Sequence, residues 1–254
     1  MVVEKPPHMV TQPGLGHVDD SLLNGLYALH GTKLQKLGKV RDFGLLHRLD
    51  RETSGLLLIA LRGTAYDELR RQFEEREIRK YYWAVVEGEL KKPMGLVNKP
   101  ILETSGKDSR EGKNRAKLAR ITSAGKPSQT AYRVLSSNSA ASVVECRPLT
   151  GRLHQVRVHM DAIGASILGD DLYGPASVGN ASNRLALHAH RIVFKHPATG
   201  DEIDIESPWP SDLKRLLARL KLPRPDAALQ SHPGVRTVKR DKEIDSDGIG
   251  DPET

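Results

Sequence analysis

The sequence predicts an α+β protein, because segments with strand and helix patterns follow one another without regular alternation. In a doubly wound parallel sheet, strands and helices would alternate regularly along the chain. The chain has 254 residues, 38% of them hydrophobic and 28% charged, which is enough to bury a core without disulfides or metals. We expect one folded domain over residues 1–222 and a disordered tail over residues 223–254, where large apolar side chains are few.

The spacing of apolar residues places the individual elements. Helices are expected where apolar side chains recur three and four residues apart: residues 20–30, 64–77, 152–163 and 211–220. Strands are expected where apolar, β-branched or aromatic residues run together or alternate: the first few residues, then 54–61, 80–90, 130–135, 142–146 and 184–195. Thr64 is the expected N-cap of the second helix. Gly31 and Gly164 are expected to end the first and third helices, and the last strand is expected to contain a bulge.

Charge is the first indication of a partner. The net charge is +7, yet residues 91–133 alone hold eleven basic and three acidic residues and so carry +8. Such a segment attracts a polyanion through phosphate contacts, although a solvated, lysine-rich loop explains the same charge. Aromatic residues make up only 4% of the chain, which argues against a surface that stacks many bases in a row. We expect residues 92–127 to be loop-like, with short stretches that could pair.

The sequence also indicates a compartment. The longest apolar run is of strand length, and the N-terminus lacks a basic-then-apolar signal pattern. The single cysteine, Cys146, excludes an internal disulfide and fits a reducing environment. We therefore expect a cytoplasmic protein that makes no contact with a membrane.

Several familiar chemistries are disfavoured. The chain has no Gly-x-Ser-x-Gly nucleophile elbow, no phosphate-binding loop and no Gly-x-Gly-x-x-Gly dinucleotide motif. Histidines gather late in the sequence, at positions 154, 159, 188, 190 and 196. His154 and His159 lie about 140° apart around a helix, so they do not share a face, and His188 and His190 lack a carboxylate or thiol partner. Structural or RNA-contacting histidines are favoured, and no metal site is expected.

Two segments carry unusual clusters of polar residues. Residues 44–55 (GLLHRLDRETSG) place a lone acid, Asp50, among basic and small residues directly before a buried strand. In isolation, Asp50 is more typical of a turn or a helix cap. Residues 148–160 (PLTGRLHQVRVHM) read equally as an ordinary amphipathic helix whose Arg and His side chains face solvent.

Six motifs in order resemble those of the RluA-type pseudouridine synthases, over residues 1–220 or so. The motifs are His47-Arg48-Leu49-Asp50-x-x-Thr53-Ser54-Gly55, Lys80-x-Tyr82-x-Ala84 with Gly88, Gly125-Lys126 with Thr130, Thr150-Gly151-Arg152-x-His154-Gln155-x-Arg157-x-His159, Gly169-Asp170-x-x-Tyr173-Gly174, and Arg184-Leu-Ala-Leu-His-Ala189 followed by His196-Pro197. Two positions depart from the family pattern: Leu153 stands where Thr is usual, and Glu4 stands where Asn usually precedes Lys-Pro. The chain starts at the family's first catalytic strand, so we expect no small N-terminal RNA-binding domain.

The resemblance implies a fold and a chemistry. The fold is a mixed, mainly antiparallel sheet with flanking helices and loops around a central RNA-binding cleft, here residues 1–222. The activity is the isomerisation of specific uridines to pseudouridine in structured RNA, either large-subunit ribosomal RNA or transfer RNA. Asp50 would be the nucleophile, attacking either the sugar or the base, with Arg157 as its ion-pair partner. Tyr82 would stack on the uracil and assist removal of the last proton.

Further residues are expected to bind RNA. Arg48 would fill the space left by the extruded nucleotide and contact the RNA backbone. The other expected RNA-binding residues lie beside the motif residues or in the basic segment: His47, Arg152, His154, Lys113, Arg115 and Lys117. No cofactor, metal or obligate protein partner is expected. The alternative is a catalytically silent RNA-binding or ribosome-assembly protein on the same scaffold, which would have no need of Asp50, Tyr82 and Arg157 together.

Overall fold

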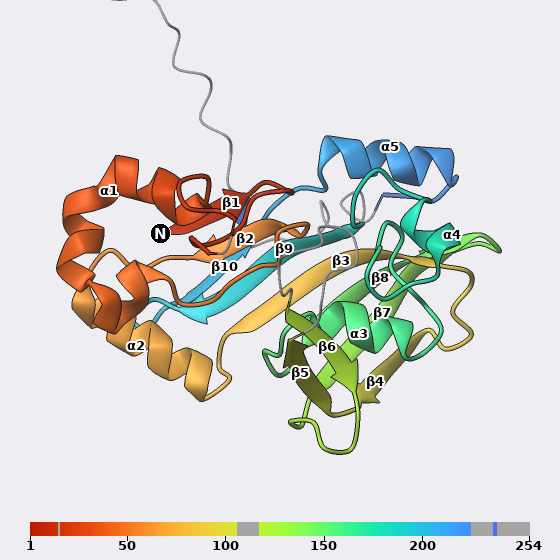
Figure 1. Cartoon of the computed structure of the whole chain (residues 1–254), viewed down its shortest axis with the longest axis horizontal. Coiled ribbons are helices and arrows are strands. Elements are labelled where there is room, and N and C mark those ends of the chain that lie inside the picture. The colour runs from red at the N-terminus through yellow and green to blue at the C-terminus, as the bar shows by residue number, and fades with distance from the viewer. Residues whose placement is uncertain (15, 106–116, 225–235, 238–254) are drawn as a thin grey trace, which may run out of the picture.

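The computed structural model describes residues 1–14, 16–105, 117–224 and 236–237. A nine-stranded sheet runs through its centre in the neighbour order β1-β2-β9-β3-β8-β7-β4, and β10 and β11 extend it beside β9 (Figure 1). Its strands are β1 (Val2–Lys5), β2 (Ser54–Leu58), β3 (Arg79–Glu87), β4 (Met94–Asn98), β7 (Gln129–Ser137), β8 (Ala141–Pro148), β9 (Leu187–Lys195), β10 (Glu202–Glu206) and β11 (Arg236–Thr237). Among the described strand pairs, only β2–β9 and β10–β11 are parallel. This is the mixed, mainly antiparallel α+β architecture that the sequence predicted.

Helices and a hairpin flank the sheet. The helices are α1 (Leu22–Leu37), α2 (Gly63–Glu74), α3 (Gln155–Asp161), α4 (Ala176–Gly179) and α5 (Ser211–Arg219), with a 3-10 segment η1 (Lys39–Gly44). The separate hairpin consists of β5 (Ile101–Ser105) and β6 (Lys117–Ile121), next to α3 (Figure 1). No described helix is long and apolar enough to cross a bilayer.

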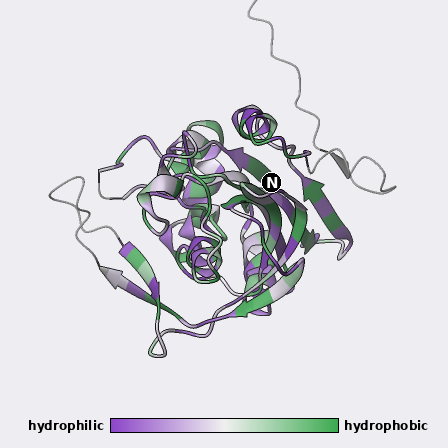
Figure 2. Ribbon diagram, turned by 90° about the vertical axis from the view of Figure 1, so that its right-hand side faces the viewer, coloured by the Kyte–Doolittle hydropathy of each residue, from purple (hydrophilic) through white to green (hydrophobic). Residues whose placement is uncertain are grey.

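Alternating residues of β2 separate two hydrophobic cores. Leu57 belongs to the larger core, which contains buried residues of α1, α3 and α5, whereas Leu56 and Leu58 face a smaller core against α2. This division follows from the period of two along a strand. Figure 2, which looks along α5, shows the hydrophobic and hydrophilic residues that make this helix amphipathic. Its buried residues Leu213, Leu216 and Leu217 pack on the larger core.

Strand β9 is the hub of the sheet. Its first part pairs with β2 and its second part with β10 on one side, while β3 pairs along the other side. The β3 partners step from Arg191 to Ala189 between Tyr81 and Tyr82. His190 is therefore the extra residue of the expected bulge. Its ring lies parallel to Trp83 with the centroids 3.9 Å apart. His190 and His188 are both completely buried in this region.

Several expected boundaries are wrong for local physical reasons. Helix α1 kinks at His30 but continues past Gly31, because Leu34 and Leu37 in its last turns are buried in the core. Helix α2 begins at Gly63, and Arg62 stands at its N-cap position without a side-chain hydrogen bond, so Thr64 is not the cap. Helix α3 is shorter than expected and begins only at Gln155.

The tail expected over residues 223–254 lies outside the described residues, except for residues 223–224 and β11. The two residues of β11 pair parallel with Ile205 and Glu206 of β10.

Gly55 allows β2 to lie against β9 immediately after the Asp50 loop. Its φ is +124°, and a Cβ at this position would lie 2.3 Å from the carbonyl oxygen of Ala189. Both the backbone conformation and the close approach require glycine.

We expect Gly55→Ala to lower the free energy of unfolding by about 3 kcal/mol or more, through backbone strain and overpacking together. Gly164→Ala is the control, because Gly164 also has a positive φ, +74°, but open space around it. It should cost only about 1 kcal/mol. Urea unfolding of both variants measures the difference, and equal losses would show that the contact with Ala189 contributes nothing.

Candidate active site

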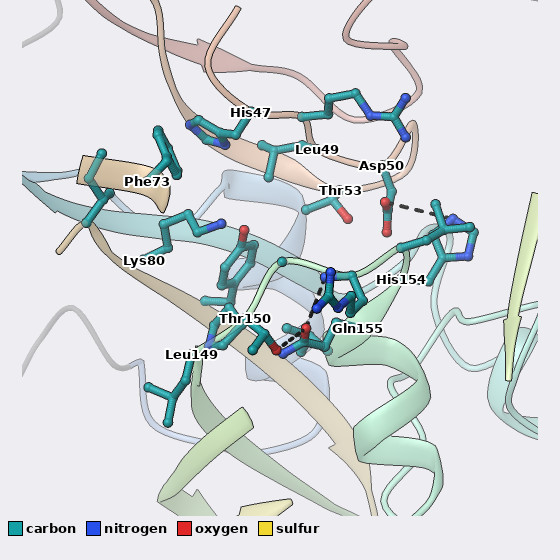
Figure 3. Close-up of a pocket in the computed structure, with 18 of the residues that line it drawn as sticks. His47, Leu49, Asp50, Thr53, Phe73, Lys80, Leu149, Thr150, His154 and Gln155 are labelled. Carbon is teal, nitrogen blue, oxygen red and sulfur yellow. Dashed lines mark hydrogen bonds and ion pairs between the residues drawn. The ribbon is translucent and has the colours of Figure 1, made fainter. Parts of the chain in front are cut away.

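A cavity of about 560 Å³ lies where the loop before β2, the end of α2, β3 and the start of α3 meet (Figure 3). Its lining is rich in positive charge, with six basic side chains: Arg48, Arg70, Arg76, Lys80, Arg152 and Arg157. Three carboxylates also line it: Asp50, Glu74 and Glu103. The cavity therefore suits an anionic ligand and contains one acid, Asp50, from the loop that the sequence singled out.

Asp50 is held in the cavity wall by the backbone around it. Its carbonyl oxygen accepts a hydrogen bond from the Thr53 amide, which makes a turn of this segment. The fully buried Lys5 ammonium donates to the carbonyl oxygens of Pro6, Met9 and Arg51, and so ties the N-terminal segment to the residue after Asp50. The Asp50 side chain itself is 24% exposed. The main chain of Asp50 forms the turn that a lone aspartate suggests, while its carboxylate stays accessible.

Two basic side chains lie close to that carboxylate. Nη1 of Arg157 is 3.7 Å from Oδ2 of Asp50, and Nε2 of His154 is 3.8 Å from Oδ1. The dashed line in Figure 3 marks the contact with His154. Both residues belong to the segment that reads as an ordinary surface helix, and that interpretation is wrong: the Arg157 side chain is 3% exposed and His159 is fully buried.

Arg157 has a closer partner than Asp50. Its Nε and Nη2 each donate a hydrogen bond of 2.8 Å to the Asp170 carboxylate, which is only 1% exposed. Asp170 also accepts from the backbone amides of Leu172 and Tyr173. Burial alone would raise the pKa of Asp170, but these hydrogen bonds and the Arg157 charge outweigh it and hold the pKa below its usual value. Arg157 thus bridges Asp170 and Asp50.

His154 is oriented by a chain of hydrogen bonds. Its backbone is left-handed, with φ 51°, and Nδ1 lies 2.6 Å from the Tyr173 hydroxyl. That hydroxyl accepts from the amide of Ala119 in β6. From these contacts we assign the phenol proton to the bond with Nδ1, which leaves the imidazole proton on Nε2, facing Asp50. Burial lowers the pKa of His154 despite the nearby Asp50 charge, so the neutral ring is favoured.

The Gln155 side chain shapes the entry to α3. Its Oε1 accepts from the Thr150 hydroxyl, as drawn in Figure 3, and from the Arg152 amide. Its Nε2 donates to the Thr130 hydroxyl. Thr130 also lies 2.9 Å from Nδ1 of His159. These bonds keep residues 150–154 out of the helix, which is why α3 starts later than its apolar pattern suggests.

Tyr82 lies on the cavity side of β3. Its side chain lines the cavity and is nearly buried. Burial and the charge of Asp50 raise the pKa of Tyr82 well above its usual value, so its hydroxyl stays protonated at neutral pH.

The expected RNA-binding residues fall into three groups. His47, Arg48, Arg152 and His154 all line the cavity. Of these, Arg48 is exposed, whereas His47 is partly buried and its Nε2 accepts from the Leu58 amide. Lys117 is exposed at the start of β6 and does not line the cavity. Lys113 and Arg115 lie outside the described residues.

Sequence reasoning missed two parts of the site. Asp170 and Tyr173 were quoted only as motif residues, without a role. Tyr173 lies three residues after Asp170. The same loop therefore supplies Asp170 as the partner of Arg157 and Tyr173 as the partner of His154. In the part of the chain that the structure describes, no group of three or more His, Cys, Asp or Glu side chains is placed to hold a metal ion.

Comparisons with known proteins agree on one family. The family described as RNA pseudouridylate synthase matches residues 1–162. The ribosomal large subunit pseudouridine synthase D of Zymomonas mobilis is 37% identical over 230 residues, covering 87% of this chain and 70% of that protein. The ribosomal large subunit pseudouridine synthase C of Escherichia coli is 35% identical over 228 residues, covering 87% of this chain and 67% of its own. The solved structure of human RNA pseudouridylate synthase domain containing 4 has a TM-score of 0.66 and 26% identity, covering 88% of this chain and 90% of its own.

We expect Asp170→Asn to lower the free energy of unfolding by about 3 kcal/mol at pH 7, because it leaves the buried Arg157 charge without its closest partner. A carboxylate whose folded pKa is depressed stabilises the fold above its unfolded pKa and loses that effect as pH falls through the folded value. The gap between wild type and Asp170→Asn should therefore be constant above about pH 5 and shrink below about pH 4. Denaturant unfolding across pH measures it, with exposed Asp19→Asn as the control, and a gap that persists at pH 2 would contradict the assignment.

We expect Tyr173→Phe to let the imidazole proton of His154 occupy either ring nitrogen. The variant retains the aromatic ring but loses the hydroxyl that is hydrogen-bonded to Nδ1. The ¹⁵N shifts of the two ring nitrogens measure the tautomer. Wild type should show one tautomer with the proton on Nε2, and the variant a mixture. The same tautomer in both proteins would mean that Tyr173 does not orient His154.

Proposed function

The chain belongs to the RNA pseudouridylate synthase family, and we propose that it isomerises uridines of large-subunit ribosomal RNA to pseudouridine with Asp50 as the nucleophile. The observation that carries this proposal is the position of Asp50: an accessible carboxylate in a basic cavity, 3.7 Å from a buried arginine. The choice of RNA rests on the printed names of its relatives, the ribosomal large subunit pseudouridine synthases of Zymomonas mobilis and Escherichia coli.

The reaction exchanges one bond for another on the same nucleotide. The bond between N1 of uracil and C1′ of ribose breaks, the base turns, and a bond forms between C5 and C1′, while C5 loses a proton and N1 gains one. Asp50 attacks either the ribose or the ring and forms the covalent intermediate that retains the fragment. The Arg157 guanidinium beside the carboxylate supplies an opposite charge and limits the orientations of the carboxylate. No redox partner or second substrate is required by this balance.

Tyr82 and Arg48 serve the uridine itself. Tyr82 offers a flat ring on the cavity wall, and its protonated hydroxyl favours stacking and hydrogen bonding over service as a phenolate base. Arg48 is exposed beside Asp50 and lines the cavity mouth, where it can replace the extruded base in the RNA stack. Extrusion costs a few kcal/mol of stacking, which contacts between the basic lining and phosphates offset.

Release of tritium from RNA labelled at C5 of its uridines tests the proposal, because only C5–C1′ bond formation expels that hydrogen. Unmodified large-subunit ribosomal RNA and transfer RNA, both transcribed in vitro, are the two substrates. We expect release from the ribosomal RNA with wild type and none with Asp50→Asn. The control is Asp67→Asn, which removes a surface carboxylate paired with Arg41 and should leave release unchanged.

The other outcomes each decide something. Release by Asp50→Asn would remove Asp50 from the nucleophile role. Release from transfer RNA alone would overturn the choice of substrate but keep the chemistry. RNA binding by folded wild type without release from either RNA would favour a silent RNA-binding protein. Asp50→Asn should bind RNA within about tenfold of wild type, since a neutral amide keeps the shape and adds no repulsion.

A further inference from the structure

The cavity has a second end that the proposed chemistry does not use. In Figure 3, Asp50 and His154 lie at one side, whereas His47, Phe73 and Lys80 gather at the other. The second end is formed by the last turns of α2 and the start of β3. Lys80 and Tyr82 are two residues apart on β3, about 7 Å along the strand, and both line the cavity.

Lys80 is a desolvated charge without a counter-ion. Its ammonium lies 5.5 Å from the centre of the Phe73 ring. It makes no ion pair or hydrogen bond with any of the described residues. Burial lowers the pKa of Lys80 to about 8, so the ammonium remains charged at neutral pH but is poorly solvated. Such a group destabilises the fold unless a ligand meets it.

The neighbours of Lys80 also supply donors rather than acceptors. Because Nε2 of His47 accepts from the Leu58 amide, its Nδ1 carries the proton, and this atom has no partner among the described residues. Arg76 is exposed at the rim without an ion pair in the described chain, while Arg70 is bonded to Glu74. Glu74, the α2 carboxylate that lines the cavity, is therefore already paired, and this end of the cavity favours an anion.

We propose that this end is a phosphate-binding subsite in which Lys80 holds a backbone phosphate of the RNA next to the extruded uridine. The proposal rests on the proposed function, because it takes the uracil to stack on Tyr82. A uridine stacked on Tyr82 has its own phosphates close to the uracil ring. Lys80 is the basic residue two positions away on the same strand. Glu103 is the third carboxylate of the cavity lining. It comes from β5, whereas this end of the cavity is formed by α2 and β3.

Binding to unmodified large-subunit ribosomal RNA, measured across salt concentrations, tests the subsite. Lys80→Met should weaken binding by roughly ten- to a hundredfold, as expected for one charge-assisted contact. It should also make the slope of log affinity against log salt shallower by about 0.7, the value for one phosphate contact with a single strand. Lys80→Arg should keep the slope. Lys195→Met is the charge-matched control, since Lys195 is exposed and its ammonium lies 3.5 Å from Glu77.

Stability separates this role from a structural one. Because Lys80→Met removes a half-buried charge that has no ion pair among the described residues, its urea midpoint should equal or exceed that of wild type. A lower midpoint for Lys80→Met and for Lys80→Gln would mean that the ammonium supports the fold, and would overturn the proposal. Weaker binding with an unchanged salt slope would also overturn it, in favour of a contact with an uncharged uracil oxygen. Unchanged binding would exclude any contact. Failure of the proposed function shows separately, as absence of tritium release by wild type on the same RNA.

Discussion

The buried ion pair of Arg157 with Asp170 is the interaction on which the site depends. It joins α3 to the loop that follows it, and both hydrogen bonds are 2.8 Å long within a nearly dry environment. A pair of this kind contributes modest net stability but fixes geometry strongly, because either charge alone would be costly to bury. With two of its nitrogens committed to Asp170, Arg157 can present only Nη1 to Asp50. The Asp50 carboxylate therefore faces a guanidinium whose orientation is fixed.

Other contacts extend this arrangement outward. Tyr173, in the same loop as Asp170, connects His154 to the amide of Ala119 in the hairpin β5–β6. The guanidinium carbon of Arg157 also lies 5.1 Å from the centre of the Tyr173 ring. One short loop thus sets the positions of both Arg157 and His154 beside Asp50. On the opposite wall, Lys5 and the backbone turn at Thr53 hold Asp50 from behind.

The sequence allowed much of this site to be predicted, and the failures have physical causes. Asp50, Tyr82 and Arg157 were expected together, and the structure places all three on one cavity. The closer partnership of Arg157 with Asp170 was not predicted, because the separation in sequence between a helix residue and a residue of the following loop does not reveal which carboxylate a buried arginine meets. The roles of these residues in catalysis and RNA binding remain predictions.

The fold class was predicted from the order of elements alone, but individual boundaries depended on burial and side-chain bonds. Leu34 carries α1 past Gly31, where local propensity favours an end. Gln155 delays the start of α3 by bonding to the residues before it. At α1 burial in the core outweighs the local signal, and at α3 the hydrogen bonds of one side chain to the residues just before it do so.

The parallel pairing of β2 with β9 determines when the Asp50 loop can take its position during synthesis. Ser54 and His188, which are hydrogen-bonded across this pair, are separated by 134 positions in the chain. Contacts between such distant segments form late, because a long loop must close before they are gained. The loop that carries Asp50 thus emerges from the ribosome early but cannot take its place until β9 has been synthesised. A nascent chain that holds Asp50 but lacks β9 would therefore not yet have a completed cavity.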